Sequence, residues 1–226
     1  METFLHYEER GTGAPLILLH GNGEDGSYFV HQMNDLSRDY RVIAVDTRGH
    51  GRSPRGTAPF TLGQFVQDLA DFLKAMELER VHLLGFSDGG NIALLFALRY
   101  PERVEKLILN GANLKPWGVK PLVQLPICLG YGLTSLLSLV DEGARAKKEL
   151  LGLMVREPHI PLSMLRRLRV PTLVIAGDRD MIREAHTRAI AGAIPGAKLE
   201  ILPGGHFIAN QNSAAFNAAV EAFLKE

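Results

Sequence analysis

Short apolar runs alternate with stretches of helical periodicity along most of the chain. Several runs are apolar throughout, which is typical of strands that helices cover on both faces. This alternation predicts an α/β fold with a mostly parallel central sheet. We expect about seven strands, at Phe4–Glu8, Leu16–Leu19, Val42–Val45, Val81–Leu84, Val104–Leu109, Thr172–Ala176 and Lys198–Leu202. We expect helices near Ser27–Leu36, Leu62–Met76, Gly90–Arg99, Arg183–Ala193 and Ala214–Lys225.

The alternation stops once, between Ala112 and about Leu168, where no strand pattern occurs. A long interruption inside a compact domain is typical of a functional lid or a small inserted subdomain. We therefore expect a core formed by residues 1–111 and 169–226, with a short helical cap at 112–168. Residues 121–140 of this cap carry no charge. Prolines and glycines interrupt them, so we expect two short elements and no membrane span. These form either a mobile apolar cover over a pocket or an ordinary buried helix pair.

Composition narrows the class of protein. A chain of 226 residues is long enough for one well-buried domain. Its 25 basic and 25 acidic side chains cancel, and no Lys/Arg cluster is interleaved with aromatic residues, so we expect no nucleic-acid partner. Cys128 is the only cysteine, which excludes an internal disulfide and fits a reducing compartment. The first residues show no secretory pattern. We expect a cytoplasmic protein without stable membrane insertion, and the composition leaves its oligomeric state open.

One motif carries chemistry directly. Residues 85–90 read Gly-Phe-Ser-Asp-Gly-Gly, a G-x-S-x-G sequence between an expected strand and an expected helix. In that context the serine lies on a sharp turn, and the flanking glycines remove side chains that would clash around it. Ser87 is thereby placed at the carboxyl end of a strand and the start of a helix. We expect it to be a nucleophile.

A serine nucleophile needs a base, and a carboxylate that orients the base. His206 follows the last expected strand and Pro203-Gly204-Gly205, so it lies at the same edge of the sheet as Ser87. Asp178 and Asp180 both follow the strand Thr172–Ala176. Asp180 completes the chain order Ser, Asp, His, while Asp178 is the competing candidate, with a backbone hydrogen bond in the turn as its alternative role.

Together with two further segments, these motifs resemble the α/β-hydrolase-fold family over nearly the whole chain. The matching segments are Leu18–Gly23, Asp46–Ser53, Gly85–Gly90, Gly177–Asp180 and Gly204–Phe207. The resemblance implies a Ser87–Asp180–His206 triad, because the family's acid is normally the last residue of a G-x-x-D segment. It also implies an oxyanion hole made by the backbone N–H groups of Asn22 and Asp88. Family members commonly have eight strands, and this chain has room for only one before Leu16, so we expect the family's first strand to be absent or very short.

Asp88 is the most informative residue outside the triad. Many relatives carry an apolar residue directly after the nucleophile, and the Ser-Asp-Gly-Gly pattern is similar to that of relatives that cleave amino-acid esters. If its carboxylate faces the pocket, Asp88 would bind a cationic substrate group. The alternative is that Asp88 points away and interacts favourably with the helix dipole. Trp117 and Tyr131, in the expected cap, are further candidates for substrate binding, although core packing accounts for such residues equally well.

These residues predict a serine hydrolase that cleaves a small ester-type carbonyl substrate through an acyl-enzyme. Lactone opening, carbon–carbon bond hydrolysis, thioester cleavage and peracid formation use the same triad and remain alternatives. A non-catalytic ligand-binding protein of this fold is a further one. We expect no cofactor. We also expect no metal site, because no His, Cys or Asp residues show ligand spacing.

Overall fold

The computed structural model describes residues 5–226. The described strands are β1 (Tyr7–Arg10), β2 (Ala14–Leu19), β3 (Tyr40–Val45), β4 (Val81–Phe86), β5 (Val104–Asn110), β6 (Thr172–Gly177) and β7 (Lys198–Leu202). The α-helices are α1 (Val30–Leu36), α2 (Leu62–Ala75), α3 (Asp88–Arg99), α4 (Pro121–Leu137), α5 (Glu142–Arg156), α6 (Leu162–Leu165), α7 (Glu184–Ala193), α8 (Ile208–Gln211) and α9 (Ser213–Leu224). Short 3-10 turns lie at Gly26–Phe29, Pro101–Arg103 and Pro116–Gly118.

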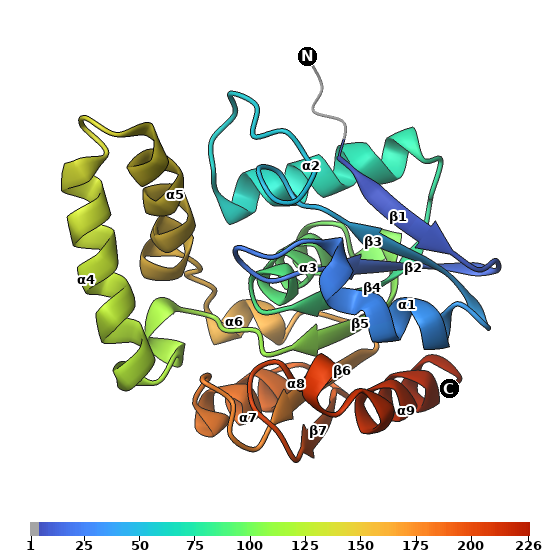
Figure 1. Cartoon of the computed structure of the whole chain (residues 1–226). Coiled ribbons are helices and arrows are strands. Elements are labelled where there is room, and N and C mark those ends of the chain that lie inside the picture. Colours follow the sequence, from blue (N-terminus) through green and yellow to red (C-terminus); the bar gives the residue numbers. More distant parts are fainter. Residues whose placement is uncertain (1–4) are drawn as a thin grey trace.

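The strands form one sheet in the order β1-β3-β2-β4-β5-β6-β7. Only the β1–β3 pair is antiparallel, with Tyr7 opposite Val45, and the other pairs are parallel. Within the described residues, this confirms the predicted mostly parallel sheet of about seven strands. The predicted first strand starts earlier than β1, and its Phe4 lies outside the described residues. Because β4, β6 and β7 run in the same direction, their carboxyl ends share one edge of the sheet (Figure 1).

Alternate side chains of the strands point into two separate cores. Ile17 and Leu19 of β2 pack in the cluster that contains apolar side chains of α2, α3 and α7. Leu16 and Leu18 pack in the cluster of α1, α8 and α9. Both faces of the sheet are therefore covered by helices, which explains the continuous apolar runs in the central strands.

Helices α4 and α5 form a hairpin beside the core, with α5 between α4 and the rest of the chain (Figure 1). The prediction of two short elements in 121–140 was wrong, because α4 runs without a break from Pro121 to Leu137. Pro121 occupies the first turn, where a proline costs little. Pro126 lies little more than one turn further along, on the exposed side of the helix, where the carbonyl that loses its N–H partner is not buried among apolar side chains. The alternative of a buried helix pair is also wrong, since Leu122 is 90% exposed.

The hairpin joins the core through a narrow neck. The backbone N–H of Ile160 donates to the carbonyl of Leu114 at 2.8 Å, so the two chain segments that lead into and out of the hairpin lie side by side. On the opposite side of the hairpin, Arg55 forms a bidentate ion pair with Glu149 of α5 at 2.7 and 2.6 Å. Among residues 5–226, no helix is long and apolar enough to cross a membrane.

Candidate active site

The turn after β4 holds Ser87 in strained backbone geometry. Its φ of 53° and ψ of −118° lie in a region that L-residues rarely adopt. The turn requires glycine on both sides, because an added Cβ would lie 2.2 Å from the Gly89 carbonyl oxygen at Gly85 and 2.0 Å from the Leu19 carbonyl oxygen at Gly89. The chain then enters α3 directly, with the Asn91 N–H bonded to the Ser87 carbonyl at 3.0 Å. The structure thus presents the Ser87 hydroxyl at the carboxyl edge of the sheet.

His206 lies between Ser87 and Asp180. Its Nε2 is 3.0 Å from the Ser87 Oγ, and its Nδ1 is 2.7 Å from the Asp180 Oδ1. An ionised carboxylate only accepts hydrogen bonds, so Nδ1 carries the proton and Nε2 accepts from the serine hydroxyl. The side chains of His206 and Asp180 are 6% and 3% exposed, so this pair is shielded from water. The structure brings together the three residues that the sequence places at the ends of β4, β6 and β7.

The two candidate acids differ in what they contact. Asp180 also accepts from the backbone N–H of Ile182 at 2.8 Å, which fixes its carboxylate toward His206. Asp178 instead accepts from the backbone N–H of Gly204 at 2.9 Å and has a half-exposed side chain. Its carboxylate therefore braces the loop that carries His206, and Asp180 is the acid that touches the histidine.

Two backbone N–H groups lie at the positions that the resemblance assigns to an oxyanion hole. Within the described chain, neither Asn22 nor Asp88 donates its backbone N–H to a protein acceptor. The Asn22 loop is held from both sides, because Glu24 accepts from the Gly21 N–H at 3.3 Å and the Asn22 side chain donates to the Leu150 carbonyl of α5 at 2.7 Å. The contact with Leu150 could not be read from the sequence, since it depends on where the cap lies.

The histidine that precedes this loop has a structural environment. His20 is buried, its Nδ1 lies 2.7 Å from the Gly21 carbonyl, and its Nε2 accepts from the backbone N–H of Thr47 at 3.0 Å. Burial lowers the pKa of His20 to about 4, so the ring is neutral at ordinary pH. Its bonds position the Gly21–Asn22 backbone.

Asp88 is buried at the start of α3. The Asn91 side chain donates to its Oδ1 at 3.2 Å, whereas its Oδ2 is enclosed without a hydrogen-bond partner among the described residues. The pKa of Asp88 is raised to about 6, chiefly by burial and to a smaller extent by the charge of nearby Glu157. The side chains of Asn91 and Asn22 and the charge of His206 act in the opposite direction. The carboxylate is thus close to the site and incompletely paired.

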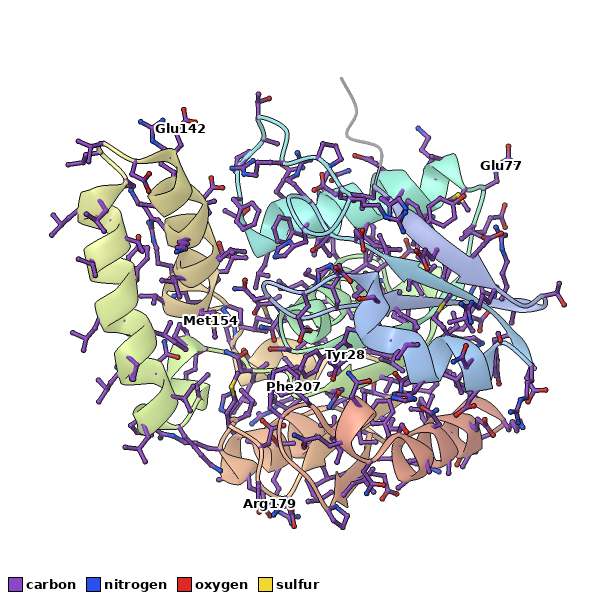
Figure 2. The ribbon with its side chains drawn as sticks, viewed as in Figure 1. Tyr28, Glu77, Glu142, Met154, Arg179 and Phe207 are labelled. Atoms are coloured by element: carbon purple, nitrogen blue, oxygen red, sulfur yellow. The ribbon has the colours of Figure 1, made fainter. Side chains whose placement is uncertain are left out.

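Aromatic rings that the sequence analysis did not single out enclose the base. Phe86, directly before the serine, lies 4.8 Å from the His206 ring and stacks on Tyr28 at 4.4 Å between ring centroids. Phe207 lies 5.6 Å from Phe86, and Figure 2 shows Tyr28 and Phe207 near one another. Phe86 occupies the first x position of G-x-S-x-G, directly before the serine, and this is the sequence feature from which its place beside the site could have been predicted. These rings hold the imidazole in place and exclude water from one side of it.

The two candidate substrate-binding residues of the cap lie apart. Tyr131 lines a cavity of about 600 Å³ between the α4–α5 hairpin and Phe60, and Glu157 lines the same cavity. None of the triad residues lines this cavity. Trp117 is 53% exposed and lines a separate cleft of about 610 Å³ with His186. That cleft is not lined by the triad residues. Nowhere in residues 5–226 do three or more His, Cys, Asp or Glu side chains lie together as metal ligands.

Comparison with known proteins agrees with this geometry. The family model for the alpha/beta hydrolase fold matches residues 14–150. A putative carbamate hydrolase, RutD, from Caulobacter is 30% identical over 97% of this chain and 95% of its own length. The human serine hydrolase BPHL is 28% identical over 98% of this chain and 83% of its own. The solved structure of a meta-cleavage product hydrolase from Pseudomonas fluorescens superposes with a TM-score of 0.79 at 26% identity, covering 98% of this chain and 94% of the other. The chain belongs to the alpha/beta hydrolase fold family.

Proposed function

We propose that this protein is a serine hydrolase that cleaves small ester-type carbonyl substrates through an acyl-enzyme. The observation that carries the proposal is the continuous contact from Ser87 through His206 to Asp180, at 3.0 and 2.7 Å. Relatives are named as serine, carbamate and meta-cleavage product hydrolases. Lactone opening, carbon–carbon bond hydrolysis, thioester cleavage and peracid formation use the same kind of triad and stay alternatives.

The proposed reaction has two steps. His206 Nε2 takes the proton of Ser87 as its Oγ attacks the carbonyl carbon, and the N–H groups of Asn22 and Asp88 stabilise the resulting oxyanion. The tetrahedral intermediate collapses, the leaving alkoxide receives the proton from His206, and an ester of Ser87 remains. His206 then deprotonates water, which attacks this ester, and its proton returns to Ser87 as the acid departs. Asp180 stabilises the imidazolium in both steps.

A fluorophosphonate probe and p-nitrophenyl acetate test the proposal together. We expect the probe to label the wild-type protein once, on Ser87, and the Ser87→Ala variant to lose both labelling and turnover. A matched control is Ser163→Ala, which removes a hydroxyl from an exposed position outside the site. Wild-type protein that is folded yet neither reacts with the probe nor turns over any ester would contradict the proposal and favour a ligand-binding protein.

A panel of esters decides among the reaction types. It contains p-nitrophenyl esters of increasing acyl length, a thioester and a lactone, all at the same concentration. The proposal expects the highest kcat/KM for a short acyl ester. A lactone or thioester that is preferred by tenfold or more would replace the ester as the substrate class while leaving the triad mechanism intact.

A second candidate substrate class is an ester with a protonated amine in its acyl group. The observation in its favour is the Asp88 carboxylate, which follows the nucleophile, is buried beside the site and keeps Oδ2 unpaired. A buried carboxylate gains most from a cation that supplies the missing hydrogen bond. We expect Asp88→Asn to lower kcat/KM for an aminoacyl ester by tenfold or more and to change that for the matching acyl ester much less. Equal losses on both esters would exclude this role.

A further inference from the structure

The outer side of α4 carries an unusual amount of exposed apolar surface. Helix α4 forms one edge of the molecule, and in Figure 2 its side chains project away from α5. Its buried residue, Gln124, instead reaches toward α5 and donates to the Met154 carbonyl at 3.0 Å. Eight large aliphatic residues between positions 122 and 140 are 47% to 90% exposed: Leu122, Leu125, Leu129, Leu133, Leu136, Leu137, Leu139 and Val140. We refer to this set, with Pro126, as the α4 stripe.

The spacing of the stripe is that of a coiled-coil seam. Within α4 its central positions form two interleaved series of seven-residue spacing, Leu122, Leu129 and Leu136 in one and Pro126 and Leu133 in the other, while Leu139 and Val140 lie in the turn that follows the helix. Apolar residues that recur in this way line up on the side of a helix that packs against a second helix. The stripe therefore has the pattern of a surface that binds a helix.

The stripe is also complementary to itself in the antiparallel direction. When two copies of α4 cross antiparallel with their Tyr131 residues level, Pro126 lies opposite Leu136 and Leu129 lies opposite Leu133. Leu122 then lies beside the end of the other α4, where the turn with Leu139 and Val140 begins. Gly132 lies near the centre of this arrangement, and a Cβ added there would meet nothing within 4 Å. Self-complementarity of this kind is what a two-fold symmetric interface requires.

Charges at the two ends of the stripe favour the same arrangement. Residues 121–140 carry no charge, whereas Lys120 precedes them and Asp141 and Glu142 follow them, all three exposed. Figure 2 shows Glu142 at the far end of the hairpin. In an antiparallel pair each Lys120 lies level with the acidic pair of the other copy. A parallel pair would instead place like charges together.

We propose that the α4 stripe binds the α4 stripe of a second copy of this chain, which gives an antiparallel, two-fold symmetric dimer. The exposed surface of the eight aliphatic residues is on the order of 1,000 Å², whereas a stable interface buries roughly 800 Å² per partner. It also exceeds the roughly 300–600 Å² of the largest apolar patch on a typical monomer. A membrane surface is the less suitable occupant, because helices that bind one carry basic residues along their polar side and α4 carries none.

The mass of the protein in solution tests the proposal independently of its catalytic function. Size-exclusion chromatography with light scattering is expected to give twice the chain mass for the wild type in the micromolar range. The double variant Leu129→Glu/Leu133→Glu places four carboxylates at the centre of the interface and is expected to be monomeric. Its control is Val30→Glu, which changes a 50% exposed residue of α1 and is expected to remain dimeric. Circular dichroism verifies that each variant is folded.

A charge exchange tests the direction of the pairing. Lys120→Glu and Glu142→Lys are each expected to raise the dimer dissociation constant by about fivefold to tenfold, and the two together are expected to restore it. Wild-type protein that is monomeric throughout the micromolar range would overturn the proposal. A dimer that the Leu129→Glu/Leu133→Glu variant leaves intact would also overturn it. So would a monomer that floats with vesicles of phosphatidylcholine and phosphatidylserine through Leu129 and Leu133.

Discussion

The side-chain amide of Asn22 donates a 2.7 Å hydrogen bond to the backbone carbonyl of Leu150. Asn22 belongs to the loop that offers a backbone N–H to the proposed oxyanion, and Leu150 belongs to α5 of the cap. The cap therefore helps to position the backbone N–H of Asn22, which we propose for the oxyanion hole, although the cap contributes no triad residue.

Replacing Asn22 by alanine removes the side-chain bond to Leu150 but leaves the backbone N–H of residue 22 in place. We expect Asn22→Ala to lower kcat about tenfold, less than the roughly 100-fold or greater loss when an oxyanion donor is removed outright. Steady-state kinetics with p-nitrophenyl acetate measure the effect. Arg55→Gln is the control, because it breaks the ion pair between the core and Glu149 of the same helix without touching the Asn22 loop. If both variants lost kcat equally, the loss would come from displacement of the cap and not from the bond between Asn22 and Leu150.

The two acids of the Gly177–Asp180 segment form a natural matched pair. Asp180→Asn keeps the shape but removes the acceptor that fixes the His206 tautomer, so we expect kcat to fall by roughly 10³ to 10⁴. Asp178→Asn affects the hydrogen bond to the Gly204 N–H and an exposed ion pair with Arg179, and we expect kcat to change less than fivefold. The ranking is checked on one substrate at one pH. The reverse ranking would assign the acid to Asp178.

Alanine substitutions at two glycines with positive φ distinguish the effect of backbone strain from the effect of a clash in the active site. Gly111 has a φ of +61°, and a Cβ there would lie 2.8 Å from Cε1 of His206. Gly196 has a φ of +73° and nothing within 4 Å of an added Cβ. Alanine at either position should lower the free energy of unfolding by about 1 kcal/mol, because both backbones are left-handed. Only Gly111→Ala should lower kcat, by at least tenfold, and denaturant titration with kinetics on both variants checks this.

The buried carboxyl of Asp88 makes stability depend on pH. Its pKa rises from 3.8 in the unfolded chain to about 6 in the fold, so between these values the folded state binds more protons than the unfolded state. The free energy of unfolding therefore falls as the pH rises through this window, and above pH 6 the charged carboxyl costs up to about 3 kcal/mol. Asp88→Asn removes that charge.

We expect Asp88→Asn to be more stable than the wild type at pH 7.5, with a difference that narrows steadily as the pH falls from 6 to 4. Urea titrations at several pH values measure it. A difference that stays constant with pH would mean that the carboxyl titrates alike in the folded and unfolded chains.

The sheet and the placement of Ser87, Asp180 and His206 were accessible from the sequence for one physical reason. Each of these residues lies three or four positions after the end of a predicted strand, so the strand pattern also locates them at the edge where parallel strands end. The mostly parallel sheet and the family are confirmed. The catalytic roles of the three residues remain predictions that the variants above test.

Contacts between distant segments were not accessible in the same way. The packing of Phe86 on His206 and the bond from Asn22 to Leu150 depend on tertiary placement, which local periodicity does not encode. The continuous course of α4 was missed because proline is a weak helix breaker near a helix start and on an exposed side. The surroundings of Trp117 could not be predicted either, because its position in the sequence of the cap does not indicate which cleft it lines.

The neck between Leu114 and Ile160 has a consequence for how this protein changes over evolution. Because the chain leaves and re-enters the core at two hydrogen-bonded residues, the hairpin between them can lengthen, shorten or be replaced without shifting the pairing of β5 with β6. The strand ends that carry the nucleophile, the acid and the base then keep their positions. New specificity can arise by exchange of one insert on an unchanged scaffold.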